Sequence, residues 1–206
     1  MATDQKLHWE KIYKDKSPDQ VSWTQSIPQT SLDLIEHANL PKNAAIIDVG
    51  GGESHLIDHL LMLGYSDLSV LDISKNAIER SKQRLGSKAD GVQWIEADIR
   101  VFKPTRTYSL WHDRAVFHFL TNEDDIAHYK QLISRHVNHT LIMSTFSLTG
   151  PLKCSGLPIK QYSEELLQEQ FAPHVELLEG IEEKHQTPFG TTQDFICTRF
   201  KMKTID

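Results

Sequence analysis

An apolar segment that contains an acidic residue and runs into three consecutive glycines is the feature that most constrains this chain. Residues 44–49 read Ala-Ala-Ile-Ile-Asp-Val, which predicts a buried strand, and Gly50, Gly51 and Gly52 follow directly. Over residues 54–63 the apolar positions recur at helical spacing. Glycines at such a turn let the backbone reverse tightly and let a ligand approach the start of the helix. The segment therefore predicts a strand, a ligand-binding turn and a helix.

The rest of the chain alternates short apolar runs with amphipathic stretches, which is typical of strand–helix–strand units and a mainly parallel sheet. We expect strands at 44–49, 68–72, 92–98, 108–112, 140–146, 175–181 and 192–200. We expect helices at 7–13, 31–39, 54–63, 74–86 and 121–137, and a last one that begins near Ser163. A turn around Pro188 and Gly190 predicts a final hairpin. The fold class is thus α/β, with a seven-stranded, mainly parallel sheet, one antiparallel strand near the C-terminus and helices on both faces.

The length of the chain predicts a single domain over residues 1–206, since 206 residues with 39% hydrophobic side chains suffice for one sizeable core. We expect residues 41–206 to form the α/β core. Residues 1–40 hold two short helices that we expect to cap the carboxyl edge of the sheet.

The composition of the chain limits the classes of molecule that it can bind. A formal charge of −6 disfavours nucleic acid, and no apolar run approaches the roughly 20 residues of a bilayer span. Cys154 and Cys197 belong to no paired motif, so we expect neither a disulfide framework nor a thiolate zinc site. The first residues lack an apolar signal segment. We therefore expect a cytoplasmic protein that binds no membrane.

Two further acidic residues join Asp48 at the same edge of the sheet. Asp72 ends the second expected strand and Asp98 the third. Ligands of open α/β sheets bind at the carboxyl ends of the strands, where a carboxylate after the second strand accepts the hydroxyls of a ribose. A carboxylate after the third strand can accept the amine of an adenine, with Ile73 and Ile99 on either side of the ring. The pattern predicts a site for a nucleoside.

These residues resemble the signature of class I S-adenosylmethionine-dependent methyltransferases, in which an acid precedes a Gly-x-Gly turn and further acids follow the second and third strands. The resemblance covers nearly the whole chain, and it implies a Rossmann-like fold with S-adenosylmethionine as cofactor. It also implies that Asp48 and glycines 50–52 face the methionine part, that Asp72 binds the ribose and that Asp98 binds the adenine. The third glycine often seen in this family is replaced by Ser54.

Three aromatic residues near the N-terminus are candidates for a lid. Trp9, Tyr13 and Trp23 can close over the cofactor and shield its sulfonium through cation–π contacts. Plain packing of these rings on the sheet is the alternative. Related methyltransferases use such a lid.

A charged segment follows the fourth expected strand, where this fold places the group to be methylated. It contains His112, Asp113 and Arg114. The Asp-Arg pair is similar to that of the thiopurine and small-thiol methyltransferases, in which these residues lie beside the acceptor sulfur. A fixed Arg114 would favour the thiolate form of the acceptor, with Asp113 orienting Arg114 or relaying the proton. His112 and His118 are the alternative bases.

We therefore expect a methyltransferase that acts on a small molecule, a thiol or another chalcogen compound. The segment lacks the Asn/Asp-Pro-Pro-aromatic sequence that grips planar amides, so those acceptors are disfavoured. Two alternatives stay open: a protein lysine acceptor with Asp113 as its base, and a nonenzymatic protein that binds S-adenosylmethionine. No metal is expected, because His55 and His59 lack a third ligand nearby in the sequence. Nothing in the sequence defines the oligomeric state.

Overall fold

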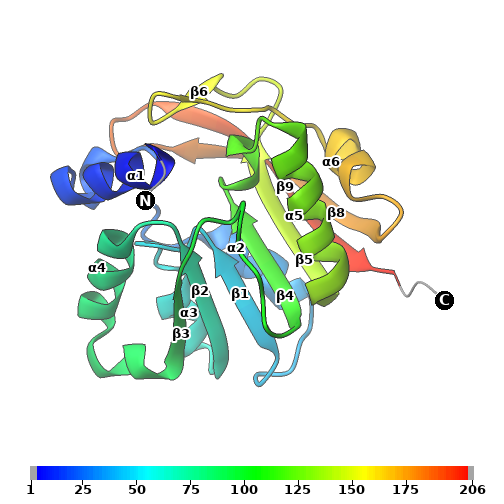
Figure 1. The fold of residues 1–206 in the computed structure, drawn as a ribbon, viewed down its shortest axis with the longest axis horizontal. Helices are drawn as coiled ribbons and strands as arrows, with labels where there is room; N and C mark the ends of the chain where they lie inside the picture. Colours follow the sequence, from blue (N-terminus) through cyan, green and yellow to red (C-terminus); the bar gives the residue numbers. More distant parts are fainter. Residues whose placement is uncertain (1–3, 204–206) are drawn as a thin grey trace.

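The computed structural model describes residues 4–203, and within this range a seven-stranded sheet has the order β3-β2-β1-β4-β5-β9-β8 (Figure 1). Its strands are β1 (Ala45–Val49), β2 (Asp67–Asp72), β3 (Val92–Glu96), β4 (Tyr108–Arg114), β5 (Val137–Phe146), β8 (Val175–Gln186) and β9 (Thr192–Met202). The helices are α1 (Asp4–Asp15), α2 (Gln29–His37), α3 (Leu56–Met62), α4 (Lys75–Leu85), α5 (Glu123–His136) and α6 (Glu164–Phe171). A separate small hairpin pairs β6 (Lys153–Cys154) with β7 (Leu157–Pro158).

The sheet is mainly parallel. β1 pairs with β2 and β4, β2 with β3, and β4 with β5, all in parallel, whereas β9 runs antiparallel to both β5 and β8. The turn between β8 and β9 contains Gly190 at a φ of +77°, which glycine adopts without strain. This Rossmann-like arrangement with one antiparallel strand near the C-terminus confirms the predicted fold class.

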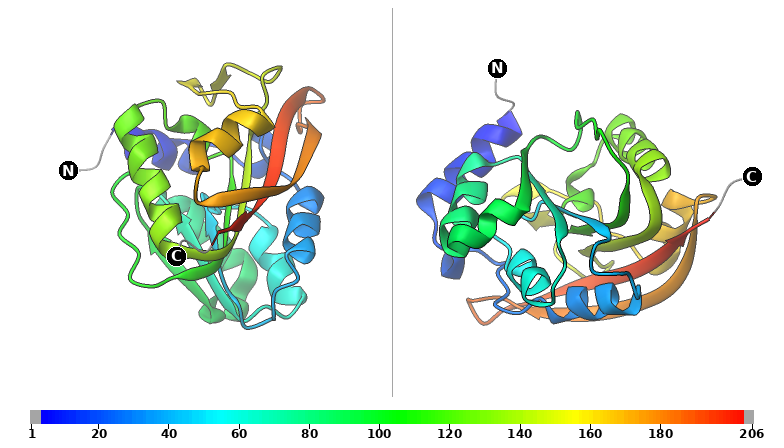
Figure 2. Two further views of the ribbon diagram at one scale, coloured as in Figure 1. Left: turned by 90° about the vertical axis from the view of Figure 1, so that its right-hand side faces the viewer. Right: turned by 90° about the horizontal axis from the view of Figure 1, so that it is seen from below.

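Helices cover both faces of the sheet, as the two views in Figure 2 show. On one face, α5 and α6 bury Ile133 and Phe171 in a core with Trp111 of β4. On the other face, α2 and α3 bury Leu34 and Leu60 in a second core. The apolar residues that recur at helical spacing in these segments are therefore the ones that pack on the sheet.

The N-terminal 40 residues do not act as one cap. The helix α2 packs on a face of the sheet as part of the core, because its residues Leu34 and Ile35 are fully apolar and buried. Only α1 and the segment after it lie over the carboxyl edge, beside α4 (Figure 1). The helix α2 thus packs with the core of the sheet. Of the predicted domain, residues 1–3 and 204–206 lie outside the described residues.

Among the strand ends that differ from the prediction, those of β3 and β4 bear on the site. β4 continues to Arg114, because Asp113 and Arg114 pair in register with Met143 and Ser144 of β5. β3 ends at Glu96, so that Asp98 lies in the turn that follows. Within residues 4–203, no helix has both the length and the apolar character needed to cross a membrane.

Candidate active site

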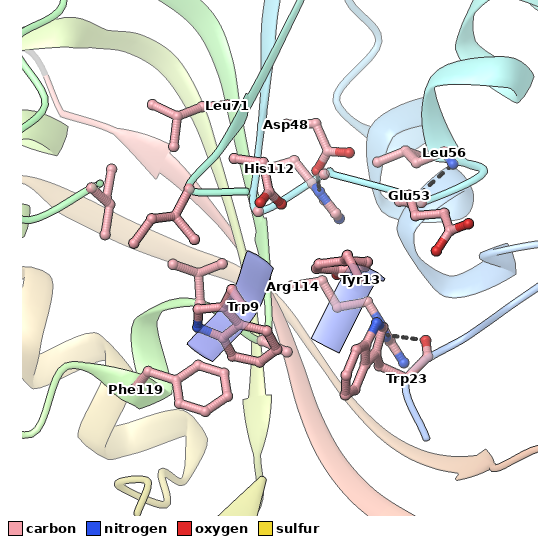
Figure 3. A pocket seen from close by; sticks show the side chains of 18 of the residues that line it. Trp9, Tyr13, Trp23, Asp48, Glu53, Leu56, Leu71, His112, Arg114 and Phe119 are labelled. Carbon is pink, nitrogen blue, oxygen red and sulfur yellow. Dashed lines mark hydrogen bonds and ion pairs between the residues drawn. The ribbon is translucent and has the colours of Figure 1, made fainter. Parts of the chain in front are cut away.

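A pocket lies at the carboxyl ends of β1, β2 and β4, with α1 on its outer side (Figure 3). The sequence-predicted residues that line it are Trp9, Tyr13, Trp23, Asp48, Gly50, Gly51, Asp72, Ile73, Asp98, Ile99, His112 and Arg114. Gly52 and Asp113 are not part of its lining. Residues far apart in the sequence thus meet at one edge of the sheet, where the chemistry of this fold takes place.

The glycine turn brings backbone close to two carboxylates. Gly50 has a φ of +70°, and a Cβ on Gly51 would lie 2.4 Å from Oδ2 of Asp48. A Cβ on Gly52 would lie 2.5 Å from Oδ2 of Asp72, so a larger residue there would press on that carboxylate. The three glycines therefore leave room for the acids as well as for a ligand.

Asp48 is buried at the end of β1 and held on one side only. Its Oδ1 lies 2.7 Å from Nδ1 of His112, and Nε2 of His112 lies 2.9 Å from Oγ of Ser31. Because a carboxylate only accepts, Nδ1–H of His112 donates to Asp48, while Nε2 pairs with the serine hydroxyl. Oδ2 of Asp48 has no hydrogen-bond partner among residues 4–203. This geometry makes His112 a positioning residue for Asp48, and it does not favour the predicted role as a base.

Asp72, at the end of β2, is a second buried carboxylate in the pocket. Its Oδ1 accepts the backbone N–H of Ser74 at 2.8 Å. Burial raises the pKa of Asp72 to about 7, with a contribution from the negative charge of Asp48 and in spite of the hydrogen bond from Ser74. A ligand that donates hydrogen bonds to Asp72 would favour its ionised form.

The far end of the pocket is lined by Ile73, Asp98 and Ile99. Asp98 accepts hydrogen bonds from Nε of Arg100 at 2.9 and 3.1 Å. Burial raises the pKa of Asp98, but the hydrogen bonds from Arg100 outweigh that effect and lower it overall. The carboxylate is therefore fixed in its ionised, hydrogen-bond-accepting form by a residue that the sequence analysis missed.

The aromatic residues of the N-terminal segment form one cluster over the pocket. The ring centroid of Trp9 lies 5.7 Å from that of Trp23 and 5.3 Å from that of Phe119, both edge to face. Tyr13 stands 6.3 Å from Trp23. The rings pack on one another and also line the pocket, so packing and shielding use the same side chains (Figure 3).

Glu10 fastens α1 to the rest of the protein, and sequence reasoning missed it. Its carboxylate accepts the backbone N–H groups of Lys75 (2.8 Å) and Asn76 (3.1 Å) and the hydroxyl of Ser74 (2.9 Å). These donors form the first turn of α4, where a helix lacks internal partners and attracts negative charge. Burial raises the pKa of Glu10, but the hydrogen bonds from Asn76 and Lys75 lower it overall. Glu10 thus positions the aromatic cluster.

We expect Glu10→Gln to loosen this attachment, because the amide keeps the shape but loses the charge. Hydrogen exchange over residues 4–15 should speed up, and S-adenosylhomocysteine should restore protection. The affinity for S-adenosylhomocysteine should fall by about 5- to 10-fold, as for the loss of a helix cap worth about 1 kcal/mol. Lys11→Gln, an exposed change on the same helix, is the control. Exchange unaltered by Glu10→Gln would show that α1 is held by its aromatic side chains alone.

Asp113 faces away from the pocket, contrary to prediction. Successive residues of a strand point to opposite sides of the sheet, so Asp113 and Arg114 cannot face the same side. Oδ1 of Asp113 accepts the backbone N–H groups of Val116 (2.9 Å) and Phe117 (3.2 Å), and Oδ2 accepts the hydroxyl of Tyr129 (2.5 Å). Burial raises the pKa of Asp113 to about 6, although these hydrogen bonds lower it. Asp113 therefore shapes the turn after β4 and does not hold Arg114.

We expect Asp113→Asn to act on stability. The amide would place donors opposite the Tyr129 hydroxyl, which already accepts from Nε1 of Trp111 at 2.9 Å. The free energy of unfolding should drop by about 1–3 kcal/mol, the cost of a lost buried charged hydrogen bond. Urea unfolding measures it, with the exposed Asp124→Asn as the control. The affinity of the folded variant for S-adenosylhomocysteine should stay within threefold; a selective loss of activity without loss of stability would restore the catalytic role.

Arg114 reaches into the pocket from the last position of β4. Its Nη1 donates to the backbone carbonyl of Trp23 at 3.2 Å, and its guanidinium lies 4.7 Å from the ring centroid of Phe195. Nη2 lies 3.8 Å from Oε1 of Glu183, beyond hydrogen-bond distance. The side chain is only 13% exposed, yet Nε and Nη2 find no hydrogen-bond partner in the described chain. Burial lowers the pKa of Arg114, opposed by the charge of Glu183.

The remaining candidates are poor catalysts. Cys154 lines the pocket, but burial raises its thiol pKa to about 11 in spite of the nearby charge of Arg114. His118 lies outside the pocket, and burial lowers its pKa to about 3. Among residues 4–203, no three His, Cys, Asp or Glu side chains converge on a metal-ion position.

Comparison with known proteins is informative about the class. Residues 46–139 match the methyltransferase domain family. The eEF1A lysine and N-terminal methyltransferase of Mus musculus is 26% identical over 123 residues, which cover 58% of this chain. That stretch is 17% of the mouse protein, so the chain spans a small part of the length of this relative.

Solved structures share the fold at low identity. The structure from a study of the conversion of a disulfide bond into a thioacetal group during echinomycin biosynthesis has a TM-score of 0.75 at 19% identity, over 96% of this chain and 93% of its own. The 1,6-didemethyltoxoflavin-N1-methyltransferase of Burkholderia thailandensis, with bound S-adenosylhomocysteine, has a TM-score of 0.73 at 14% identity, over 97% and 88%. At these identities the solved structures show a shared fold, and the family match spans residues 46–139, a little under half of the chain.

The residues of the pocket fit S-adenosylmethionine. The unpartnered Oδ2 of Asp48 is an acceptor for an ammonium, and the turn at Gly50 and Gly51 leaves a cradle that a Cβ would fill. Asp72 can accept ribose hydroxyls. S-adenosylmethionine is therefore the cofactor that both the relatives and the residues support.

Proposed function

We propose that this protein transfers a methyl group from S-adenosylmethionine to a small anionic nucleophile, with a thiol or another chalcogen compound as the favoured acceptor. One observation carries the proposal: a buried guanidinium, Arg114, shares a pocket with the acids that suit the cofactor. A positive charge in a pocket of low dielectric stabilises an anionic acceptor and destabilises a cationic one.

Five residues would hold the cofactor. Oδ2 of Asp48 would accept from its ammonium, Asp72 from its ribose hydroxyls and Asp98 from its adenine amine, with Ile73 and Ile99 beside the ring. When bound, S-adenosylmethionine supplies a methyl group on a sulfonium centre. Methyl transfer needs proximity, alignment and exclusion of water. The aromatic cluster of Trp9, Trp23 and Phe119, fastened by Glu10, would provide that exclusion.

For a thiol acceptor, Arg114 would act on the ionisation of the substrate. A guanidinium beside a thiol lowers the pKa of that thiol and increases the fraction of the reactive thiolate. No protein base is needed, which agrees with the hydrogen bonds of both His112 nitrogens and with the position of Asp113 outside the pocket lining. The thioacetal chemistry of one protein with a similar fold is a further reason to test sulfur compounds.

A protein lysine is the second candidate, and the mouse relative, a lysine and N-terminal methyltransferase, favours it. A lysine acceptor must lose its proton near the methyl group, and the charge of Arg114 would help that loss. The same charge would, however, repel the ammonium form as it approaches. Asp113, the base considered for this acceptor, does not line the pocket, so we rank this candidate below the thiol.

A panel of acceptors separates the candidates. The purified protein would be incubated with S-adenosylmethionine and, in turn, small thiols, small amines and lysine-containing peptides, and S-adenosylhomocysteine would be measured. We expect turnover with thiols, increasing with pH up to the pKa of the thiol. Turnover restricted to peptides would establish the second candidate. Cofactor binding without turnover of any acceptor would indicate a nonenzymatic binder.

A further inference from the structure

The two unpartnered nitrogens of Arg114 are adjacent to one another. Nε–H and Nη2–H point to the same side of a guanidinium, and together they form the fork that donates two parallel hydrogen bonds to two oxygens. The third nitrogen, Nη1, is already held by the carbonyl of Trp23. Arg114 is thus fixed at one edge, and the two nitrogens of the edge that suits a planar, two-oxygen anion are buried without a hydrogen-bond partner in the described chain.

A buried fork without hydrogen-bond partners lowers the stability of the protein. A buried donor without a partner loses its hydration, and here two donors of one cation lack a partner in the part of the chain that the structure describes. Glu183 offsets the charge from 3.8 Å, and its Oε1 instead accepts Nε2 of Gln25 at 3.0 Å. Glu183 therefore compensates the charge of Arg114 but leaves its fork free.

The residues around the guanidinium indicate whether the anion that it binds belongs to the cofactor or to the methyl acceptor. The groups that surround Arg114 are Phe195 of β9, Glu183 of β8 and Trp23 of the N-terminal segment. β8 and β9 form the opposite end of the sheet from β2 and β3, where the cofactor acids Asp72 and Asp98 lie. In Figure 3, Arg114 and Trp23 lie at the end of the pocket away from Leu71. The fork thus belongs to the acceptor end of the pocket.

We propose that the methyl acceptor is a small thiol that also carries a carboxylate, and that Nε and Nη2 of Arg114 bind this carboxylate. The proposal rests on the proposed function and specifies its substrate class. Bound in this way, the acceptor satisfies both open donors and brings its sulfur into the field of the same guanidinium. An apolar thiol would leave the fork unpaired, so the site discriminates against it.

Two matched thiols test the proposal on the wild-type protein. 3-Mercaptopropionate and 3-mercaptopropionamide have the same length and differ at the two-oxygen group. Isothermal titration into protein saturated with S-adenosylhomocysteine measures binding without turnover. We expect the carboxylate to bind at least about tenfold more tightly than the amide, as for a hydrogen bond to a charged group. Turnover with S-adenosylmethionine should show the same preference, although the carboxylate compound has the less acidic thiol.

Variants of Arg114 identify the group responsible. Arg114→Met keeps the length without the charge, and it should abolish the preference for the carboxylate. Arg114→Lys keeps a charge but not the fork, and it should recover only part of the preference. The exposed Arg135→Met is the control and should behave as the wild type. S-adenosylhomocysteine affinity, measured for every variant, reports on folding and on the cofactor site.

Each outcome decides between the possibilities. Equal binding and turnover of both thiols would overturn the carboxylate fork and leave thiol methylation intact. A loss of S-adenosylhomocysteine affinity of more than tenfold in an Arg114→Met protein whose urea unfolding matches the wild type would also overturn it, because the fork would then hold the carboxylate of the cofactor. Arg114-dependent binding of the carboxylate without methylation would support the fork and refute the thiol acceptor. Failure of the wild-type protein to bind the carboxylate would reject the proposal.

Discussion

Gly51→Ala is expected to lower the affinity for S-adenosylmethionine by roughly 100-fold or more, equivalent to about 3 kcal/mol. The new Cβ would lie 2.4 Å from Oδ2 and 2.8 Å from Cγ of Asp48, and 3.0 Å from Cγ1 of Val70. Asp48 cannot yield without breaking its hydrogen bond to His112, because it is buried and fixed there. The added methyl group therefore displaces the acid that would meet the ammonium of the cofactor.

Gly91→Ala is the matched control. No atom of the described residues lies within 4 Å of a Cβ at this position, and its φ is not in the left-handed region. Isothermal titration should give wild-type affinity for Gly91→Ala, whereas overpacking at position 51 should also cost about 1–3 kcal/mol of stability. Wild-type affinity in a folded Gly51→Ala protein would show that Asp48 is not part of the cofactor site.

Asp72→Asn should weaken cofactor binding by roughly 10- to 150-fold, the effect of losing about 1.5–3 kcal/mol from hydrogen bonds to a charged group. The amide can still accept the N–H of Ser74 at Oδ1, but its other atom is a donor and cannot accept a ribose hydroxyl. Asp67→Asn, at the opposite end of the same strand, is the control and should leave the affinity unchanged. Equal affinities of the two variants would remove Asp72 from the site.

The pH dependence of binding gives Asp72 a separate signature. Ribose hydroxyls donate to the ionised carboxylate, whose pKa of about 7 in the free protein is raised by burial. The affinity for S-adenosylhomocysteine should therefore fall below pH 7, by up to about tenfold per pH unit, and level off above it. The stability of the free protein has the opposite pH dependence. Asp72 keeps its proton up to about pH 7 in the folded state but loses it at a pKa near 3.8 in the unfolded state, so the free energy of unfolding decreases between about pH 4 and 7. Both trends should be smaller in Asp72→Asn.

The sequence predicts the cofactor half of the protein well because that half depends on local patterns. The strand before Gly50, the helix after it and the acids after β1 and β2 are placed by hydrophobic periodicity and by turn residues. Parallel strands that share an edge then bring Asp48 and Asp72 together without further information. The final hairpin is predicted for the same reason, since a turn around Gly190 separates two apolar runs.

The acceptor half depends on contacts that no local pattern encodes. The sequence predicts that β4 ends at residue 112, before its observed end at Arg114, because charged residues within a strand resemble a loop. The directions of Asp113 and Arg114 follow from that strand. Glu10 and Glu183 act through residues 64 or more positions away, as the hydrogen bond from Ser74 to Glu10 shows. Strand alternation applied to β4 would have separated Asp113 from Arg114; no signal pointed to Glu183.

The attachment of α1 has a kinetic consequence. Glu10 holds the start of α4 through Ser74, and Ser74 in turn donates its backbone N–H to Asp72. Ser74 thus contacts both Glu10, which attaches α1, and Asp72, the acid proposed to bind the ribose. We therefore expect the opening rate of α1 to set an upper limit on the rate at which a bound nucleoside dissociates.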